Sequence, residues 1–358
     1  MQGILDIVVG GQFGSEGKGA VGAHLAKGRC DIAVRVAGPN AGHSAYDAQG
    51  RKWALRQIPV AAVVNLGLDI VLGAGSEIDP TVLADEVRSL EAAGIPILDR
   101  LHIDRHATVI RPEHIEAEGG YGGELTQRLG STGKGIGAAR SDRIWRKAEV
   151  WGEGRPIPGI DFCSMGWGTD TAAMLRSQLR RGARVMLEGT QGYGLGLHTE
   201  FYPQCTSSDC RAVDFAAMAG ITPWADCRVV NTWIATRTYP IRVAGNSGPL
   251  GGETSWAKLS EATGGYIQPE KTTVTQVERR VGEFDSELVR AAVDANGGGD
   301  GALIALTFFD YWYPELAGET STKALGQAHR DRIRVIEESV HAPVRLVGTG
   351  PDSMIELF

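Results

Sequence analysis

Gly10-Gly11-Gln12-Phe13-Gly14-Ser15-Glu16-Gly17-Lys18-Gly19 follows the apolar run from Ile4 to Val9 and precedes a stretch of helical character. The order of strand, glycine loop and helix gathers backbone N–H groups around a phosphate. Lys18 would add a mobile positive charge there. The loop differs from the P-loop of nucleoside triphosphatases, because Gly19 stands where a Ser or Thr would hold magnesium. Taken alone, the stretch also fits an ordinary tight turn.

Short apolar runs rich in Val, Ile and Leu recur along the chain, with little polar alternation. Such runs are typical of parallel strands that are buried on both faces. They lie at Ile4 to Val9, Ile32 to Val36, Ile70 to Leu72, Val185 to Leu187, Val229 to Ile234, Leu303 to Leu306 and Val344 to Val347. Helical patterns fall between some of them. The alternation predicts an α/β protein with a central, mostly parallel sheet, flanking helices and a phosphate site like that of a P-loop.

The clearest helical pattern runs from Thr81 to Ala93, with Asp79 as N-cap, Pro80 at the first position and Gly94 as stop signal. Two further helices are predicted at Ser286 to Ala295 and Arg332 to Val340.

The chain shows no internal repeat and no long low-complexity linker, which predicts a single domain over residues 1–358. Patterning is weakest at residues 113–146 and 245–282, so we expect mobile loops over a site in both places. A plain surface loop is an equal alternative for the second segment.

Composition excludes several classes of protein. A formal net charge of −7 argues against broad nucleic-acid binding, which needs a concentrated positive surface. We find neither eighteen consecutive apolar residues nor a basic, apolar leader, so the cytoplasm is the expected location. The five cysteines are odd in number and lack CxxC spacing, which predicts free thiols: Cys30, Cys163, Cys205, Cys210 and Cys227.

A second polar segment, Asn40-Ala41-Gly42-His43-Ser44, follows the next apolar run. Together with the first glycine loop it resembles the adenylosuccinate synthetase family. Further matches follow in the family's order: Gly130-Ser131-Thr132-Gly133-Lys134-Gly135-Ile136-Gly137, Glu188-Gly189-Thr190-Gln191-Gly192, Thr206-Ser207-Ser208, Arg279-Arg280-Val281-Gly282 and Gly348-Thr349-Gly350-Pro351-Asp352. The resemblance runs essentially from end to end.

The resemblance implies a two-step ligase reaction. A nucleoside triphosphate phosphorylates the 6-oxygen of a purine nucleotide, and the amine of aspartate then displaces that phosphate. The chemistry needs Mg²⁺ to neutralise the phosphates, a donor to the oxygen and an acceptor for the N1 proton. The implied partners are a purine nucleotide, L-aspartate, a triphosphate donor and a second copy of the chain, with no nucleic acid and no membrane.

Residue roles carry over by motif. The implied catalytic residues are Ser15, Lys18 and His43, and the implied magnesium ligands are Ser15 and Gly42. His43 would act as the acid that stabilises the transferred phosphoryl group. The donor nucleotide would be held by Gly14, Glu16, Gly17, Lys18, Gly19, Gly42, His43, Ser44, Phe308, Asp310, Gly348, Gly350 and Pro351.

The acceptor nucleotide and aspartate have their own sets. The acceptor would be held by Ser15, Asn40, Ser131, Thr132, Arg146, Gln191, Thr206 and Arg242, with Arg146 acting across the interface of a homodimer. Aspartate would be held by Thr273, Thr275, Arg279 and Arg280, since a guanidinium fork suits a carboxylate.

Ser15 departs from the family's Gly-Asp-Glu-Gly-Lys-Gly pattern, whose Asp accepts the N1 proton and helps to bind magnesium. A hydroxyl is a weak base near neutral pH. Guanine carries an amino group at C2, next to the N1 that this Asp would face, and Ser15 frees volume there. A phage-encoded branch of the family has this Ser and makes N6-succino-2-amino-2′-deoxyadenylate from dGMP for 2-aminoadenine DNA. The chain resembles that branch, in which case its location is the host cytoplasm.

Two other positions depart from the family. Phe308 replaces the Lys of a Thr-Lys-x-Asp motif whose Asp reads guanine, so the resemblance points to ATP or dATP rather than GTP as donor. A plain core role for Phe308 is an equal alternative. Val277 replaces the first Arg of the aspartate loop in many members. Two other functions stay open: an adenylosuccinate synthetase acting on IMP with GTP, and a catalytically weak nucleotide-binding protein.

Overall fold

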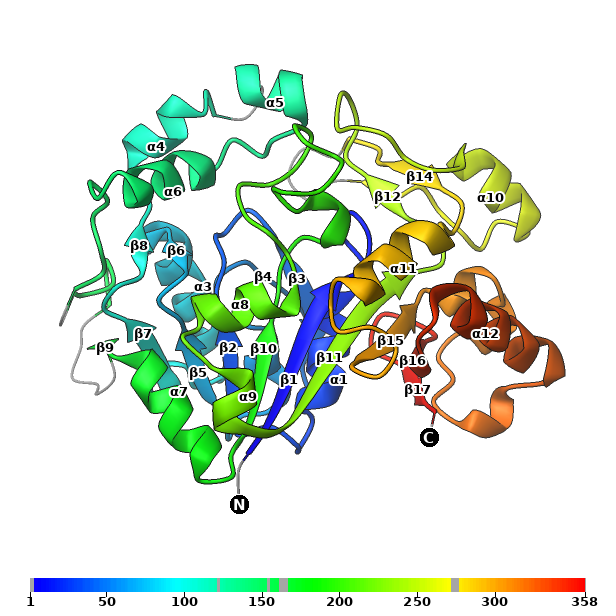
Figure 1. Ribbon diagram of the computed structural model, residues 1–358, viewed down its shortest axis with the longest axis horizontal. Coiled ribbons are helices and arrows are strands. Elements are labelled where there is room, and N and C mark those ends of the chain that lie inside the picture. The colour runs from blue at the N-terminus through cyan, green and yellow to red at the C-terminus, as the bar shows by residue number, and fades with distance from the viewer. Residues whose placement is uncertain (1–2, 121–122, 153–154, 161–166, 272–276, 358) are drawn as a thin grey trace.

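A ten-stranded sheet forms the centre of the computed structural model, which describes residues 3–120, 123–152, 155–160, 167–271 and 277–357 (Figure 1). The strand order is β17-β16-β15-β11-β1-β10-β2-β5-β7-β9, and all neighbours are parallel except β16 and β17. The strands are β1 (Gly3–Gly10), β2 (Ile32–Arg35), β5 (Asp69–Leu72), β7 (Leu101–Asp104), β9 (Trp167–Thr169), β10 (Arg184–Glu188), β11 (Cys227–Arg237), β15 (Ala302–Thr307), β16 (Val344–Gly348) and β17 (Met354–Glu356). The predicted α/β class with a mostly parallel sheet is confirmed.

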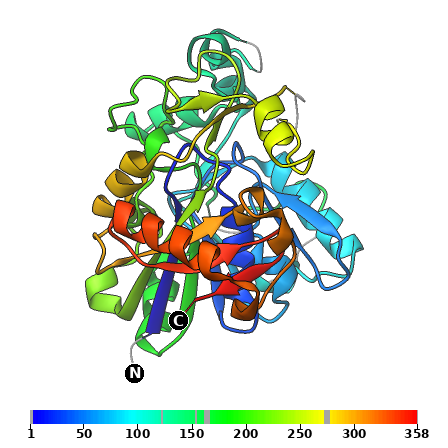
Figure 2. The ribbon, with the colours of Figure 1, turned by 90° about the vertical axis from the view of Figure 1, so that its right-hand side faces the viewer.

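All seven apolar runs named from the sequence lie on strands of this sheet. They become strands because both faces of the sheet are covered. On one face the core contains α1 (Lys18–Ala26), α2 (Ala61–Val64) and α3 (Pro80–Ala92). On the other it contains α7 (Thr171–Arg180), α8 (Ala212–Met218), α11 (Ser286–Asp294) and α12 (Gln327–Val340). Figures 1 and 2 show these helices on the two sides of the sheet.

Helix α3 has the predicted ends. The Asp79 carboxylate accepts hydrogen bonds from the backbone N–H groups of Thr81 and Val82, and Gly94 has a φ of 80° just beyond the end. Helix α11 is also confirmed, with Asp285 as its N-cap. Helix α12 begins five residues before the predicted start at Arg332, because its first turn is mostly exposed and His329 is its only buried residue there, which leaves no apolar period in the sequence.

The two segments of weak patterning contain regular structure. Residues 113–146 hold most of α4 (Pro112–Ala117), together with α5 (Glu124–Leu129) and α6 (Ile136–Ile144). These helices are short and start at Pro or Gly, so they leave no clear period in the sequence. Residues 245–282 contain β13 (Glu253–Thr254), α10 (Trp256–Ala262) and β14 (Arg280–Gly282), and β14 lies between β13 and β12 (Ile241–Arg242). Where the sequence pattern predicted loops, both segments therefore contain short helices or strands, and their mobility over a site stays a prediction.

The remaining elements are small. The hairpin β3 (His43–Tyr46) and β4 (Lys52–Leu55), the parallel pair β6 (Glu77–Ile78) and β8 (Thr108–Val109), and α9 (Pro223–Asp226) complete the fold. The parallel strands run toward the side of the molecule on which α4, α5, α6, β12 and β14 lie (Figure 1). Loops that follow the strands therefore meet beneath these elements.

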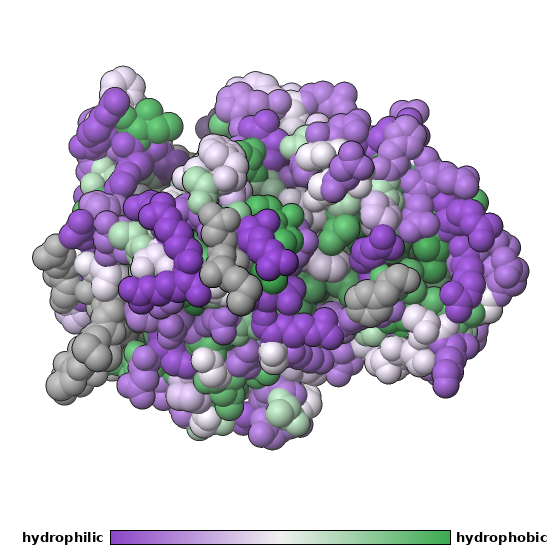
Figure 3. All heavy atoms as spheres, turned by 60° about the horizontal axis from the view of Figure 1, so that its bottom comes forward, coloured by the Kyte–Doolittle hydropathy of each residue, from purple (hydrophilic) through white to green (hydrophobic). Residues whose placement is uncertain are grey.

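The face shown in Figure 3 is mostly hydrophilic, with hydrophobic residues scattered over it. In the described ranges no helix is long and apolar enough to cross a membrane. Four cysteines in those ranges, Cys30, Cys205, Cys210 and Cys227, are free thiols, as predicted. Cys163 lies outside the described residues.

Candidate active site

The first glycine loop is closed by the side chain of Glu16. This buried carboxylate accepts hydrogen bonds from the backbone N–H groups of Gln12 (3.1 Å) and Gly14 (2.7 Å), and from Lys18 Nζ (2.6 Å). Lys18 also donates to the carbonyl of Gln191 and is 2% exposed. Glu16 therefore holds the backbone of the loop in place from inside. The positive charge of Lys18 is balanced by the Glu16 carboxylate when no ligand is bound.

The start of α1 packs directly on β3. A Cβ on Gly19 would lie 2.7 Å from the carbonyl oxygen of Ser44, so only glycine fits there. The same close approach places His43 and Ser44 beside the glycine loop. Two of the sequence motifs thus meet at one edge of the sheet.

His43 lies in a buried cluster with two groups that sequence reasoning gave no role. Its Nδ1 lies 2.6 Å from Glu188 Oε1 and 3.2 Å from an Arg35 nitrogen, and Arg35 is paired with Glu188. The second Glu188 oxygen accepts from the Val60 backbone N–H. Glu188 holds the proton on Nδ1, which leaves Nε2 as the nitrogen free for a ligand.

Burial decides the charge states of this cluster. Desolvation lowers the pKa of His43 to about 4, although the Glu188 charge acts in the opposite direction. Burial alone would raise the pKa of Glu188, but His43, Arg35 and the Val60 amide hold it below its ordinary value. His43 is therefore neutral at pH 7 without ligand, and its partner carboxylate is ionised.

Asn40 and Gln191 come together as expected for two residues that hold one base. The Gln191 amide donates to Asn40 Oδ1 at 3.4 Å, and the Thr190 hydroxyl fixes the other end of the Gln191 side chain. Because Lys18 binds the Gln191 carbonyl, this pair also borders the first glycine loop.

Ser15 is held by two arginines. The Arg279 guanidinium donates to Ser15 Oγ at 3.2 Å, and Arg237 donates to the Ser15 carbonyl at 3.1 Å. Arg237 is fully buried and paired with Glu270. One arginine of the predicted aspartate loop therefore lies at the position where the chain departs from the family pattern.

Arg280, the neighbour of Arg279, is turned elsewhere. It forms a bidentate pair with Glu253 and donates to the carbonyl of Gly248, because β14 begins at Arg280 and lies beside β13, which carries Glu253. The structure thus brings Arg279 to the site and leaves Arg280 at its edge. Thr273 and Thr275 lie outside the described residues.

Arg242 has a supporting position. Its guanidinium donates to the carbonyls of Gln204 and Pro249 and lies 4.2 Å from the centre of the Phe13 ring. Burial lowers its pKa to about 10. It joins β12 to the loop that carries Thr206, whose backbone N–H binds the carbonyl of Leu195.

The second glycine loop is also capped from inside. Glu118 accepts hydrogen bonds from the N–H groups of Gly135 (2.7 Å), Gly137 (2.7 Å) and Ala138 (3.3 Å) at the start of α6. Ser131 caps Gly133, and Thr132 is exposed. Glu118 therefore occupies the first amides of α6, so the groups that this segment leaves free for a ligand are side chains such as Thr132.

Arg146 is exposed just beyond α6 and is not brought into contact with the other predicted acceptor residues. The apolar side chains before it, Ile144 and Trp145, are 70% and 68% exposed. Within this chain, Arg146 therefore lies apart from the other predicted acceptor residues.

The end of β15 borders the first glycine loop. Thr307 Oγ1 donates to the Glu16 carbonyl at 2.8 Å, and a Cβ on Gly348 would lie 3.1 Å from Thr307 Cα. Phe308 follows, with its ring centre 4.0 Å from the Arg237 guanidinium carbon. Asp310 is 5% exposed and accepts a hydrogen bond from the Tyr266 hydroxyl. The predicted donor residues at 307–310 and 348–351 are thus adjacent to the loop.

Backbone strain marks the same region. Five described non-glycine residues have a positive φ, and four of them are predicted site residues: Ser15, Arg146, Gln191 and Phe308, with His341 as the fifth. Such conformations persist where the surroundings enforce them, and they cluster at functional sites.

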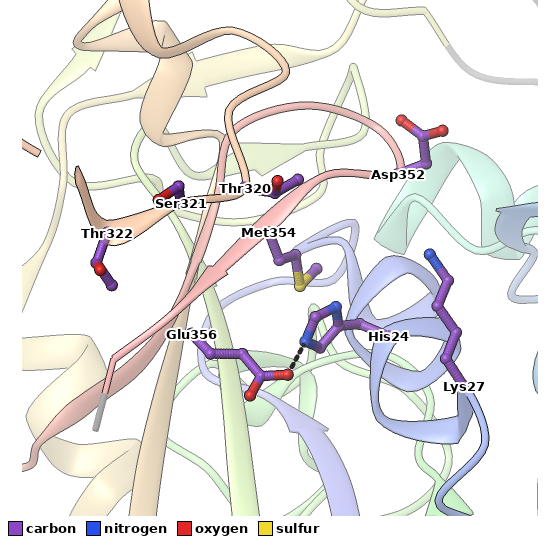
Figure 4. A pocket seen from close by; sticks show the side chains of 8 residues that line it. All are labelled: His24, Lys27, Thr320, Ser321, Thr322, Asp352, Met354 and Glu356. Carbon is purple, nitrogen blue, oxygen red and sulfur yellow. Dashed lines mark hydrogen bonds and ion pairs between the residues drawn. The ribbon is translucent and has the colours of Figure 1, made fainter. Parts of the chain in front are cut away.

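An open pocket of about 560 Å³ lies on the far half of α1, against β17 and the segment 320–322. In Figure 4, Met354 and Glu356 reach from β17 toward His24, whose Nε2 is 2.7 Å from Glu356. A neighbouring narrow pocket shares His24, Lys27 and Asp352 and includes Pro351. Of the predicted donor residues, only Pro351 lines either pocket. We therefore locate the candidate active site where the carboxyl ends of the strands meet, and not at these pockets.

The predicted metal ligands are oxygen atoms, as Mg²⁺ prefers. Ser15 and Gly42 offer a hydroxyl and an exposed backbone carbonyl. In the described ranges no group of three or more His, Cys, Asp or Glu side chains forms a metal site. This fits an ion held mainly by phosphate oxygens and water, as is usual for Mg²⁺ in phosphoryl transfer.

Sequence reasoning missed Arg35, Arg237, Glu188, Tyr266 and Glu270 as functional candidates. Three of these residues are charged residues at the ends of apolar strands, which is a feature that the sequence shows. Arg35 interrupts an apolar run, Glu188 follows another, and each is the last residue of its strand, as Arg237 is of β11. A charged residue at the carboxyl end of a buried strand points into the site edge. Tyr266 and Glu270 lie in the segment of weak pattern, where no such signal exists.

Comparisons with known proteins agree with this geometry. The family model described as adenylosuccinate synthetase matches residues 7–152 and 166–312. Adenylosuccinate synthetases from Pyrococcus sp. (strain ST700) and Archaeoglobus fulgidus are 36% and 33% identical over 97% of this chain, covering 96% and 95% of their own lengths.

Two solved structures are similar over the whole chain. Cyanophage S-2L succinoaminodeoxyadenylate synthetase (PurZ), bound to dGMP and to dATP as an energy donor, has a TM-score of 0.80 and 28% identity, covering 99% of this chain and 96% of its own. Fully ligated adenylosuccinate synthetase from Plasmodium falciparum has a TM-score of 0.81 and 20% identity, covering 99% of both chains, and shows the same fold.

Proposed function

Because the chain belongs to the adenylosuccinate synthetase family, we propose that it joins L-aspartate to C6 of dGMP, with ATP or dATP as phosphoryl donor. Family membership makes it a carbon–nitrogen ligase that joins aspartate to a purine nucleotide. The choice of dGMP, the donor and the residue roles are the proposed part. The product would be N6-succino-2-amino-2′-deoxyadenylate.

The observation that carries the choice of dGMP is Ser15 with its bond from Arg279. A hydroxyl oxygen accepts two hydrogen bonds, and Arg279 uses one of them. The second can accept from the C2 amino group of guanine. A carboxylate at the same position would be larger, would pair with Arg279 and would crowd that amino group. The similar cyanophage synthetase is bound to dGMP, which supports the same choice.

The first step would transfer the γ-phosphoryl group of the donor to the 6-oxygen of the acceptor, so that the donor leaves as its diphosphate and the N1 proton of the acceptor passes to water. Lys18 would leave Glu16 to meet the incoming phosphates, while Glu16 keeps the loop amides in place. His43 Nε2 would face the transferred group, and the negative charge of that group would raise the pKa of His43 so that it can donate a proton. Glu188 would stabilise the resulting imidazolium. Mg²⁺, when bound, neutralises phosphate charge.

In the second step the amine of aspartate attacks C6 and inorganic phosphate leaves. Arg279 would bind an aspartate carboxylate beside Ser15. Arg280 would join it only after leaving Glu253, because its guanidinium is now fully engaged. The Asn40 and Gln191 pair would hold the base in register.

An adenylosuccinate synthetase acting on IMP with GTP is the second candidate. Its support is the identity of 36% to the synthetase from Pyrococcus, higher than the 28% to the cyanophage protein. A catalytically weak nucleotide-binding protein is the third, and Ser15 in place of a carboxylate base is its support.

Phosphate release by the purified protein with Mg²⁺, aspartate and ATP tests the proposal, comparing dGMP with IMP. We expect aspartate-dependent release with dGMP only. Release with IMP only would establish the second candidate. Silence with both acceptors, tested with ATP and with GTP, would establish the third.

A further inference from the structure

Asp310 is a buried carboxylate with one oxygen already used. It lies in the short helix Phe309–Tyr311 after β15, and its Oδ2 accepts a hydrogen bond from the Tyr266 hydroxyl at 2.7 Å. Its Oδ1 is buried and has no hydrogen-bond partner among the described residues. A buried hydrogen-bond acceptor without a partner is uncommon in proteins and calls for an explanation.

Tyr266 covers this carboxylate from the outside. Its residue is 39% exposed, whereas Asp310 is 5% exposed. The Tyr266 ring meets the edge of Tyr311, with centroids 6.4 Å apart, and Tyr311 meets Phe308 at 5.1 Å. Phe308, Tyr311 and Tyr266 therefore form a continuous aromatic surface that begins beside the glycine loop and ends over Asp310.

Purine bases differ in the edge that would meet such a carboxylate. Guanine presents two adjacent donors, N1–H and the C2 amino group, which together require both oxygens of a carboxylate. Adenine presents one amino donor beside an acceptor nitrogen. A carboxylate oxygen can accept more than one hydrogen bond, but the Tyr266 hydroxyl lies 2.7 Å from Oδ2 and takes the position that a second base donor would need. The carboxylate can therefore satisfy adenine but leaves a guanine donor unpaired, which typically costs about tenfold or more in affinity.

We propose that Tyr266 selects the base of the triphosphate donor: by holding Oδ2 of Asp310, it leaves a single acceptor and so favours adenine over guanine. This inference rests on the proposed donor site at Phe308 and Asp310. It assigns a specificity role to a residue outside every family motif in the sequence. The Arg237 guanidinium under Phe308 supports the ring on which the base would stack.

Direct binding of non-hydrolysable ATP and GTP analogues with Mg²⁺, measured by calorimetry without acceptor or aspartate, tests the proposal. We expect the unmodified protein to bind the ATP analogue about tenfold or more tightly than the GTP analogue. Tyr266→Phe keeps the ring and frees Oδ2, so binding of the GTP analogue should tighten about tenfold while ATP binding changes little.

Two further variants separate this role from a structural one. Tyr313→Phe removes a neighbouring hydroxyl that does not contact Asp310, so the ratio of the two affinities should stay as in the unmodified protein. In an Asp310→Asn background, Tyr266→Phe should no longer change that ratio. An unaltered GTP affinity in Tyr266→Phe, or equal binding of both analogues by the unmodified protein, would overturn the proposal. A preference for IMP in the turnover assay would refute dGMP as acceptor and leave this result unaffected.

Discussion

Ser15 is the residue on which the choice of acceptor depends. Ser15→Asp would place a carboxylate 3 Å or so from the Arg279 guanidinium, within ion-pairing distance, and against the C2 amino group of dGMP. We expect kcat/KM for dGMP to fall about tenfold or more, while use of IMP, which lacks that group, falls less or rises. Steady-state rates with both acceptors measure this. Unchanged turnover of dGMP would remove Ser15 as the selectivity element.

His43 has an unusual titration that can be observed directly. With no ligand, burial lowers its pKa to about 4, so the imidazole is neutral over the ordinary range of pH. Binding of a triphosphate with acceptor should raise this pKa, because the phosphoryl group brings negative charge close to Nε2. Nuclear magnetic resonance titration of labelled histidine measures both values. A pKa that stays near 4 in the complex would contradict a role as acid.

The Glu188 charge raises the pKa of His43, so a variant at Glu188 serves as the control for the role of His43. Glu188→Gln removes the charge that raises the pKa of His43, and the neutral amide cannot stabilise an imidazolium. We expect kcat to fall by about 10²–10⁴, as when a general acid is lost, with smaller changes in KM. His43→Ala should behave alike, and the double variant should be no worse than either single one. Additive losses would mean that the two side chains act separately.

For individual residues, the sequence predicted which motifs lie together but not which side chains hold those motifs in place. Asn40, His43 and Gln191 were named from motifs, and they lie around the first glycine loop. Glu16 and Glu118 were not predicted as caps of the two glycine loops, because a side chain that folds back on its own loop leaves no spacing signal. Arg279 and Arg280 look equivalent in sequence, yet Arg279 contacts Ser15 whereas Arg280 is paired with Glu253 on the neighbouring strand.

Helix α3 shows an element whose ends the sequence specifies completely. Asp79 accepts from two N–H groups of the first turn, so Asp79→Ala should lower the free energy of unfolding by about 1 kcal/mol. Denaturant unfolding measures the change. The matched control is Asp85→Ala in the same helix, whose exposed pair with Arg88 should contribute less than about 0.5 kcal/mol. Equal effects of the two variants would contradict the cap.

Elements were predictable where the pattern is long and apolar. Strands such as β1 and the second half of β11 are buried on both faces, and α3 and α11 carry clear caps. The helices α4, α5 and α6 and the sheet of β12, β13 and β14 were not predictable, because each is short and held by contacts with distant segments. They are also the elements nearest the site edge, where weak local pattern and function coincide.

The whole molecule places the first glycine loop at the centre of the sheet, since β1 lies between β10 and β11. Every strand that carries a motif therefore ends near it, and this convergence follows from parallel order alone. The apolar runs of the sequence predicted a mostly parallel sheet, but not the order of its strands. The sequence did not predict the antiparallel edge strand β17, the opposite edge strand β9 or its neighbour β7, which have weaker or shorter runs.

Arg146 supplies a test at the scale of the assembly. It is exposed beyond α6 next to exposed Ile144 and Trp145, without contact to the other acceptor residues of its own chain. If it completes the site of a second subunit, as we propose, Arg146→Leu and His43→Ala should each be nearly inactive alone. When the two variants are mixed and exchange subunits, each dimer that contains one copy of each variant has one intact site. Activity should therefore return to about a quarter of the unmodified level. Sedimentation of each variant should show that both still assemble. No recovery in a mixture that exchanges would place Arg146 in the site of its own subunit.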